Sequence, residues 1–110
     1  MRKLLILPIL LVAVLLVGVS PAAAKTRSIK IGDDFFVRAS GVPVVTVKKG
    51  TTAKWRWTGN DAHNVVGSGP ASFQSPVKSS GTFKKKMKKK GTYRIVCTIH
   101  SGMRMTLKVK

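Results

Sequence analysis

The 110-residue sequence contains no glutamate, and its acidic residues are limited to Asp33, Asp34 and Asp61. With so few carboxylates, a catalytic site built on a pair of acidic residues is not expected. The single cysteine, Cys97, excludes an internal disulfide framework and any metal site that needs four cysteines. The longest apolar run, Leu4–Val19, is shorter than the roughly 20 residues that a membrane-spanning helix requires. These absences leave one small domain whose lone thiol is a core residue, a dimer link or a chemically used group.

The N-terminal segment predicts export from the cytoplasm. A positively charged start is followed by the apolar run Leu4–Val19 and by small residues ending at Ala24, which is the layout of a secretory signal peptide. We predict cleavage after Ala24, a mature domain of residues 25–110, and a periplasmic, extracellular or cell-surface location. An uncleaved membrane anchor is the alternative.

Positive charge is abundant, with 21 Lys and Arg residues and a formal net charge of +18. Such an excess first suggests nucleic acid as the partner. An exported protein rarely meets nucleic acid, however, so we expect no such partner. The charge is better matched to acidic partner proteins and to anionic membrane or wall surfaces.

Residues 25–110 show apolar and polar residues in alternation, which predicts short strands rather than helices. Turn-forming segments rich in glycine separate the strands, and this organisation is typical of an all-β sandwich, here of about seven to eight strands. The residues that share the inward parity are Ile29, Ile31, Val45, Val47, Trp55, Trp57, Tyr93, Ile95, Cys97, Met105, Leu107 and Val109.

A basic stretch, Lys84–Lys90, lies within a further predicted strand, residues 82–90. Phe83 and Met87 share one parity and are expected to face the core. Lys85 falls on the same inward parity, so we expect its side chain to snorkel at a sheet edge. A disordered tract that binds polyanions is the alternative for this stretch.

Soft and nitrogen donors occur in a spacing that suits a metal. The segment Cys97–Met103 offers a thiol, then the imidazole of His100, then a thioether, and His63 supplies the second imidazole. A thiolate, two imidazoles and a weak axial methionine form the ligand set of a blue-copper electron-transfer site. Because His63 is 34 residues away from Cys97, it must come from another strand and tie the loop to the body of the sandwich.

These motifs resemble the small blue (type 1) copper proteins of the cupredoxin superfamily, of the plastocyanin and amicyanin kind. The similarity covers essentially residues 28–110, and the short Cys-x-x-His-x-x-Met loop is closer to the amicyanin pattern. The motifs that carry it are His63-Asn64-Val65-Val66, Gly91-Thr92-Tyr93-Arg94-Ile95-Val96-Cys97 and the segment Cys97–Met103.

The resemblance implies a Greek-key sandwich that holds one copper ion cycling between Cu(I) and Cu(II). It implies that Cys97, His63 and His100 are the equatorial ligands and that Met103 is axial. Met105 has the spacing of longer-loop relatives and is the rival axial ligand, although its alternation with Leu107 also suits a core residue.

The resemblance also assigns roles next to the metal. His100 is expected to lie near the surface as the port for electrons. Asn64 is expected to form hydrogen bonds across to the segment that carries the cysteine, which supports the ligand geometry.

Together, these features predict a secreted, monomeric one-electron carrier that is not an enzyme. Its partner is expected to be a redox protein with an acidic docking surface, and association with an anionic membrane or wall surface is a further possibility. Two alternatives stay open. One is a copper-trafficking or copper-sequestering protein with the same ligands, and the other is a basic module that binds polyanions.

Overall fold

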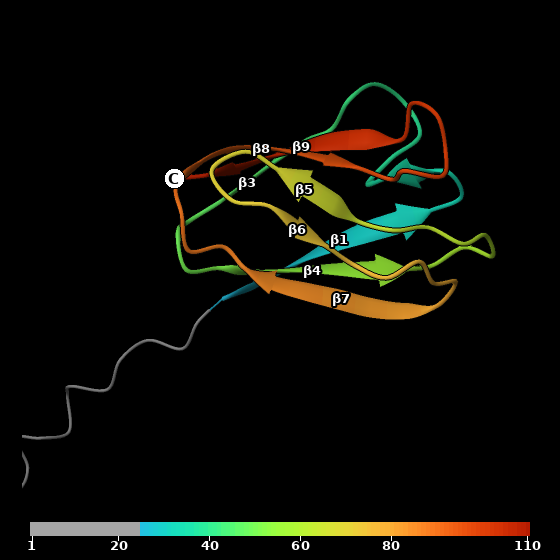
Figure 1. The fold of residues 1–110 in the computed structure, drawn as a ribbon, viewed down its shortest axis with the longest axis horizontal. Helices are drawn as coiled ribbons and strands as arrows, with labels where there is room; N and C mark the ends of the chain where they lie inside the picture. The colour runs from blue at the N-terminus through green and yellow to red at the C-terminus, as the bar shows by residue number, and fades with distance from the viewer. Residues whose placement is uncertain (1–24) are drawn as a thin grey trace, which may run out of the picture.

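The computed structural model describes residues 25–110, which form two β-sheets that face each other (Figure 1). The predicted signal peptide lies outside the described residues. The first sheet has the order β2 (Phe35–Phe36), β1 (Thr26–Gly32), β4 (Thr52–Trp57), β7 (Gly81–Lys86). The second has the order β3 (Val44–Val47), β9 (Arg104–Val109), β8 (Gly91–Val96), β5 (Val66–Ser68), β6 (Phe73–Gln74).

The all-β sandwich is confirmed, with nine strands among the described residues in place of the seven to eight predicted. The additional elements are short: β2 and β6 have two residues each. Alternation cannot be recognised over two residues, and pairing with a neighbouring strand defines these elements instead. The described part of the chain holds no helix of the length and apolarity needed to cross a membrane.

Two of the strand pairs are parallel, and they decide which segments share an end of the sandwich. β1 pairs with β4 from Thr26 opposite Thr52 to Ile31 opposite Trp57. β3 pairs in the same sense with β9, whereas the remaining neighbours are antiparallel. As a result, the start of β1 and the end of β9 lie at one end of the sandwich, as Figure 1 shows.

The core follows the predicted alternation. Trp55 is fully buried, and its ring lies against Phe73 and Phe83 at centroid distances of 5.8 and 6.0 Å. Such tilted aromatic contacts add to the free energy gained by burying the rings. The inward residues that the alternation identifies are buried throughout both sheets.

Strand β7 ends at Lys86, earlier than the predicted boundary at Lys90. It forms an edge of the first sheet. Lys85 is half-buried there, with its Nζ 5.9 Å from the centroid of the Phe73 ring. This contact confirms the snorkelling lysine, since its stem covers apolar surface while its charge stays over an aromatic face. Met87 is buried in the core as predicted.

Candidate metal centre

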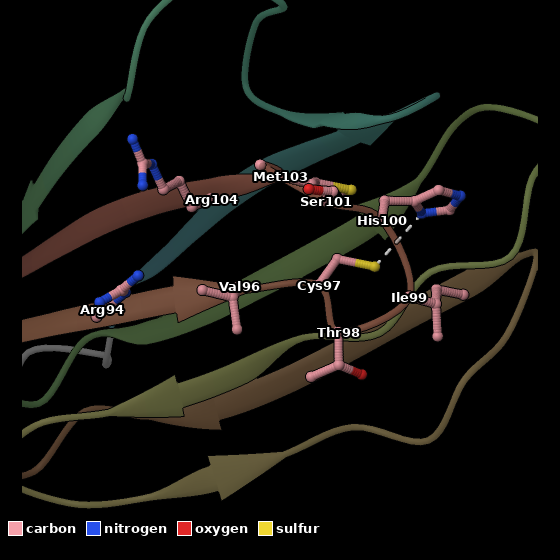
Figure 2. A pocket seen from close by; sticks show the side chains of 10 residues that line it. Arg94, Val96, Cys97, Thr98, Ile99, His100, Ser101, Met103 and Arg104 are labelled. Carbon is pink, nitrogen blue, oxygen red and sulfur yellow. Dashed lines mark hydrogen bonds between the residues drawn. The ribbon is translucent and has the colours of Figure 1, made fainter.

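The loop that joins β8 to β9 carries three of the four predicted ligands (Figure 2). The N–H of Cys97 donates to the carbonyl of Met103 at 3.0 Å, and the N–H of Met103 donates to the carbonyl of His100 at 3.3 Å. Gly102 has a φ of 78°, a left-handed conformation that favours glycine. The tight turn therefore folds Cys97, His100 and Met103 back onto one another.

His63 reaches the same place from the segment that follows β4. Its backbone exchanges hydrogen bonds with Lys78, both at 3.0 Å, and its carbonyl also accepts the indole N–H of Trp57 at 3.2 Å. The His63 side chain is 1% exposed. These contacts fix the histidine from a part of the chain that is remote from the loop.

The structure brings three predicted donor groups together. Nδ1 of His63 lies 3.1 Å from Nδ1 of His100, and Sγ of Cys97 lies 3.5 Å from Nδ1 of His100. One donor atom from each of the three side chains lies within 4.8 Å of the others. Figure 2 shows the Cys97 sulfur directed toward the His100 ring.

Both candidate axial methionines are buried, but they lie at different positions relative to the ligand loop. Met103 lies opposite Cys97, to which its carbonyl is hydrogen-bonded, and it is 3% exposed. Met105 is paired with Ile95, one inward position farther along β8 and away from the loop. In Figure 2 the Met103 side chain lies beside the loop that holds Cys97 and His100.

Asn64 makes the predicted connection between the two parts of the site. Its Nδ2 donates to Oγ1 of Thr98 at 2.8 Å, and the backbone N–H of Thr98 donates to Oδ1 of Asn64 at 2.8 Å. Asn64 is buried. This reciprocal pair locks the residue after His63 to the residue after Cys97, so the expectation for Asn64 is confirmed.

A carboxylate that the sequence analysis did not identify as part of the site contacts the ring nitrogen of His63 that points away from His100. Oδ1 of Asp33 lies 3.1 Å from Nε2 of His63. Asp33 in turn accepts the backbone N–H groups of Asn60 at 2.8 Å and Asp61 at 2.9 Å. These two bonds, followed by the His63 contact, lower the pKa of Asp33 from 3.8 to about 2. A side chain at Gly59 would collide with the Asp33 carboxylate, so glycine there leaves room for the carboxylate in this position.

The two remaining acidic residues of the sequence lie at the same place. Oδ1 of Asp34 is 3.4 Å from Nε2 of His100. The negative charge of Asp33, together with a hydrogen bond to Asp34, raises the pKa of Asp61. All three acidic residues of a strongly basic chain therefore surround the two histidines. Asp33 and His63 are 30 residues apart, so no short sequence motif could show that they are in contact.

The arrangement of the ring nitrogens suits a bound cation. An ionised Asp33 can only accept a hydrogen bond, so its contact with His63 favours the tautomer with the proton on Nε2, in which Nδ1 is the nitrogen able to bind a metal. The Nδ1 atoms of both histidines then meet beside a thiol, in a largely buried site. Imidazole nitrogen and thiolate sulfur in this combination fit copper.

Comparisons with known proteins find a matching family and similar folds. The family model described as copper-binding proteins, plastocyanin/azurin family, matches residues 41–110. No curated protein matches the chain. Oxidised plastocyanin from Dryopteris crassirhizoma is 26% identical over 76% of this chain and 100% of its own, with a TM-score of 0.64.

Two other solved structures are similar. The Cu(I) form of a methionine-to-alanine variant of amicyanin is 25% identical over 81% of this chain and 86% of its own, with a TM-score of 0.64. A copper-containing nitrite reductase from Thermus scotoductus SA-01 is 20% identical over 86% of this chain, with a TM-score of 0.68. The chain spans about a quarter of that enzyme, 24% of its length, and the likeness is one of fold.

Proposed function

Because the chain belongs to the plastocyanin/azurin family of copper-binding proteins, we propose that it is an exported one-electron carrier with a single type 1 copper ion. His63, Cys97 and His100 are the proposed equatorial ligands. The observation that carries the proposal is the convergence of two imidazole Nδ1 atoms and one thiol sulfur in a largely buried site.

Met103 is the proposed axial ligand. Met103 ends the loop directly opposite Cys97, and this position supports it over Met105, which is paired with Ile95 inside the sheet. If copper is held there, the Met103 thioether would be a weak ligand of the kind that tunes the reduction potential of a blue copper site.

When bound, copper supplies a one-electron couple, in which sulfur favours the reduced ion and nitrogen the oxidised one. The chain's own residues hold the donors in place. Asn64 and Thr98 tie the two ligand segments together, and Asp33 fixes the proton and orientation of His63. Because the donors are held from several sides, few atoms need to move when an electron arrives.

His100 is the proposed electron port. Its side chain is 26% exposed, and the neighbouring Ile99 is 47% exposed. Arg94 and Arg104 line the hollow beside the loop (Figure 2). This combination of an apolar residue and two guanidinium groups supports docking of a redox partner through an acidic surface.

In this proposal the chain alone is not an enzyme. The protein is exported and is a monomer. The sequence holds two histidines, and both serve the proposed centre, so a second copper site of the same kind has no ligands. The charged, apolar and small-residue layout of residues 1–24 supports export. Cys97 is 4% exposed, which keeps it from linking two copies through a disulfide.

Copper loading followed by visible spectroscopy tests the proposal. We expect an intense thiolate-to-copper band that ascorbate bleaches and an oxidant restores. Met87→Leu is a matched control in the core, because Met87 is buried away from the loop and its replacement conserves volume. A colourless copper adduct would contradict the proposal. Copper that passes to an apo-protein without redox cycling would favour trafficking instead.

A further inference from the structure

Lysines gather at the end of the sandwich opposite the ligand loop. We call this set the lysine end, and all its members are exposed. It comprises Lys25, Lys48, Lys49, Lys86, Lys88, Lys89, Lys90 and Lys110.

Backbone hydrogen bonds show that these residues are neighbours in space. The N–H of Lys49 donates to the carbonyl of Lys110 at 2.8 Å, which joins the β3–β4 turn to the end of β9. The N–H of Gly50 donates to Met87 at 2.8 Å, and that of Thr52 donates to Lys25 at 2.9 Å. The two lysine-bearing turns and both ends of the described chain therefore form one surface.

Strand β8 separates this surface from the metal centre. Lys90 precedes the strand and Cys97 follows it, so its six residues set a distance of about 20 Å between the two ends. The Debye length is about 8 Å at physiological ionic strength. The lysines are thus too distant to act strongly on the copper centre. The acidic residues all lie at the other end.

We propose that the lysine end docks on an anionic phospholipid membrane and leaves the metal centre facing away from it. Basic residues near such a surface each contribute about 1 kcal/mol to binding. Lys25, the first residue of the predicted mature domain, lies at this end, so in the alternative of an uncleaved anchor the apolar segment Leu4–Val19 would join the domain on the same side. This proposal does not depend on copper.

The composition of the lysine end favours lipid over a protein or single-stranded nucleic-acid partner. Stable protein interfaces have an apolar centre, and single-stranded nucleic acid is bound by exposed aromatic rings. Among residues 25–110, the exposed large hydrophobic side chains belong to Val42, Val44, Val77 and Ile99, and none is part of the lysine end. A surface of exposed charges without apolar or aromatic anchors suits a diffuse layer of lipid phosphates.

Vesicle binding by the full chain tests the proposal. Vesicles of phosphatidylglycerol and phosphatidylcholine are compared with vesicles of phosphatidylcholine alone, so that any contribution of the apolar N-terminal segment cancels. We expect the triple variant Lys88→Gln, Lys89→Gln, Lys90→Gln to lose affinity for the anionic vesicles by about a hundredfold. In 1 M salt, where the Debye length is about 3 Å, the preference of the unaltered chain for anionic vesicles should disappear.

A charge-matched control separates the lysine end from net charge. Lys54→Gln, Arg56→Gln, Lys84→Gln removes three positive charges from the outer face of β4 and β7, where Lys54 is paired with Lys84. This variant should retain most of the binding. An equal loss in the two triple variants would overturn the proposed site.

Hydrogen exchange on the vesicle-bound protein tests the orientation. Amides of residues 48–51 and 86–90 should gain protection, whereas those of the loop 97–103 should not. Protection of the loop would overturn the orientation. Equal affinity for anionic and neutral vesicles, with tight binding to a soluble polyphosphate, would overturn the membrane as the partner and indicate an anionic wall polymer instead. None of these measurements requires bound copper, so their failure is distinct from failure of the proposed electron transfer.

Discussion

The metal centre and the lysine end differ in how their side chains are held. At the metal centre His63 is held through its ring and its backbone, and Asn64 is paired reciprocally with Thr98. Within the part of the chain that the structure describes, no hydrogen bond or ion pair is formed by a lysine-end side chain. Fixed positions suit a ligand with directional bonds, whereas charges without hydrogen-bond partners suit a surface without fixed geometry. One small sandwich thus uses its two ends for two kinds of recognition.

The largest effect is expected when the thiol at the metal centre is removed. Cys97→Ser should abolish the intense visible band of the copper-loaded protein, because the band needs the thiolate. The Lys88→Gln, Lys89→Gln, Lys90→Gln variant should keep the band unchanged, since these residues lie at the other end. A band that persists without the cysteine would break the assignment of the metal centre.

A smaller effect is expected from Asp33→Asn. Loss of a carboxylate behind a metal-binding histidine typically lowers metal affinity by about 10- to 100-fold. Competition with a chelator measures this affinity, and the reduction potential should rise because a negative charge near the oxidised ion is lost. Asp61→Asn removes the same charge without the contact to His63. If both variants lowered the affinity equally, Asp33 would act by charge alone.

Replacing the two methionines sharpens the choice of axial ligand. Met103→Leu should shift the potential and the visible spectrum, whereas Met105→Leu should leave both close to their original values. Both changes conserve volume in the core, so each should cost less than about 1.5 kcal/mol of stability. The reverse result would make Met105 the axial ligand.

The smallest predicted effect concerns acid stability of the copper-free protein. The pKa of Asp33 is about 2 in the folded protein, below the ordinary 3.8, so the folded state binds fewer protons than the unfolded state. Stability from Asp33 is present above pH 4 and is lost as the pH falls toward 2. The raised pKa of Asp61 works in the opposite direction. Thermal unfolding should show a smaller decline over this range in Asp33→Asn than in the unaltered chain.

Local patterns were sufficient for much of this structure. Alternation places Trp55, Tyr93 and Leu107 in the core because strands have a period of two. The loop 97–103 could be predicted because its three donors are close in sequence. Its connection to His63 and Asn64 was accessible through the resemblance to cupredoxins.

Contacts between remote segments could not be predicted in the same way. Asp33 meets His63 because β1 and β4 run parallel and end side by side, which no short motif encodes. The lysine end likewise forms because turns from separate parts of the chain meet at one edge. The sequence therefore showed how much positive charge is present, but only the fold separates the lysine end from the acidic residues.

The parallel pairing of β1 and β4 also has a practical consequence for immobilising the protein. Residues 25 and 110 both lie at the lysine end, which strand β8 separates from the loop that carries His100. A linker attached at either residue, or adsorption on a carboxylate-coated electrode, will present His100 to the solution rather than to the support. Direct electron transfer between the electrode and the copper centre therefore requires attachment at the opposite end, for example through a cysteine introduced at exposed Ser101.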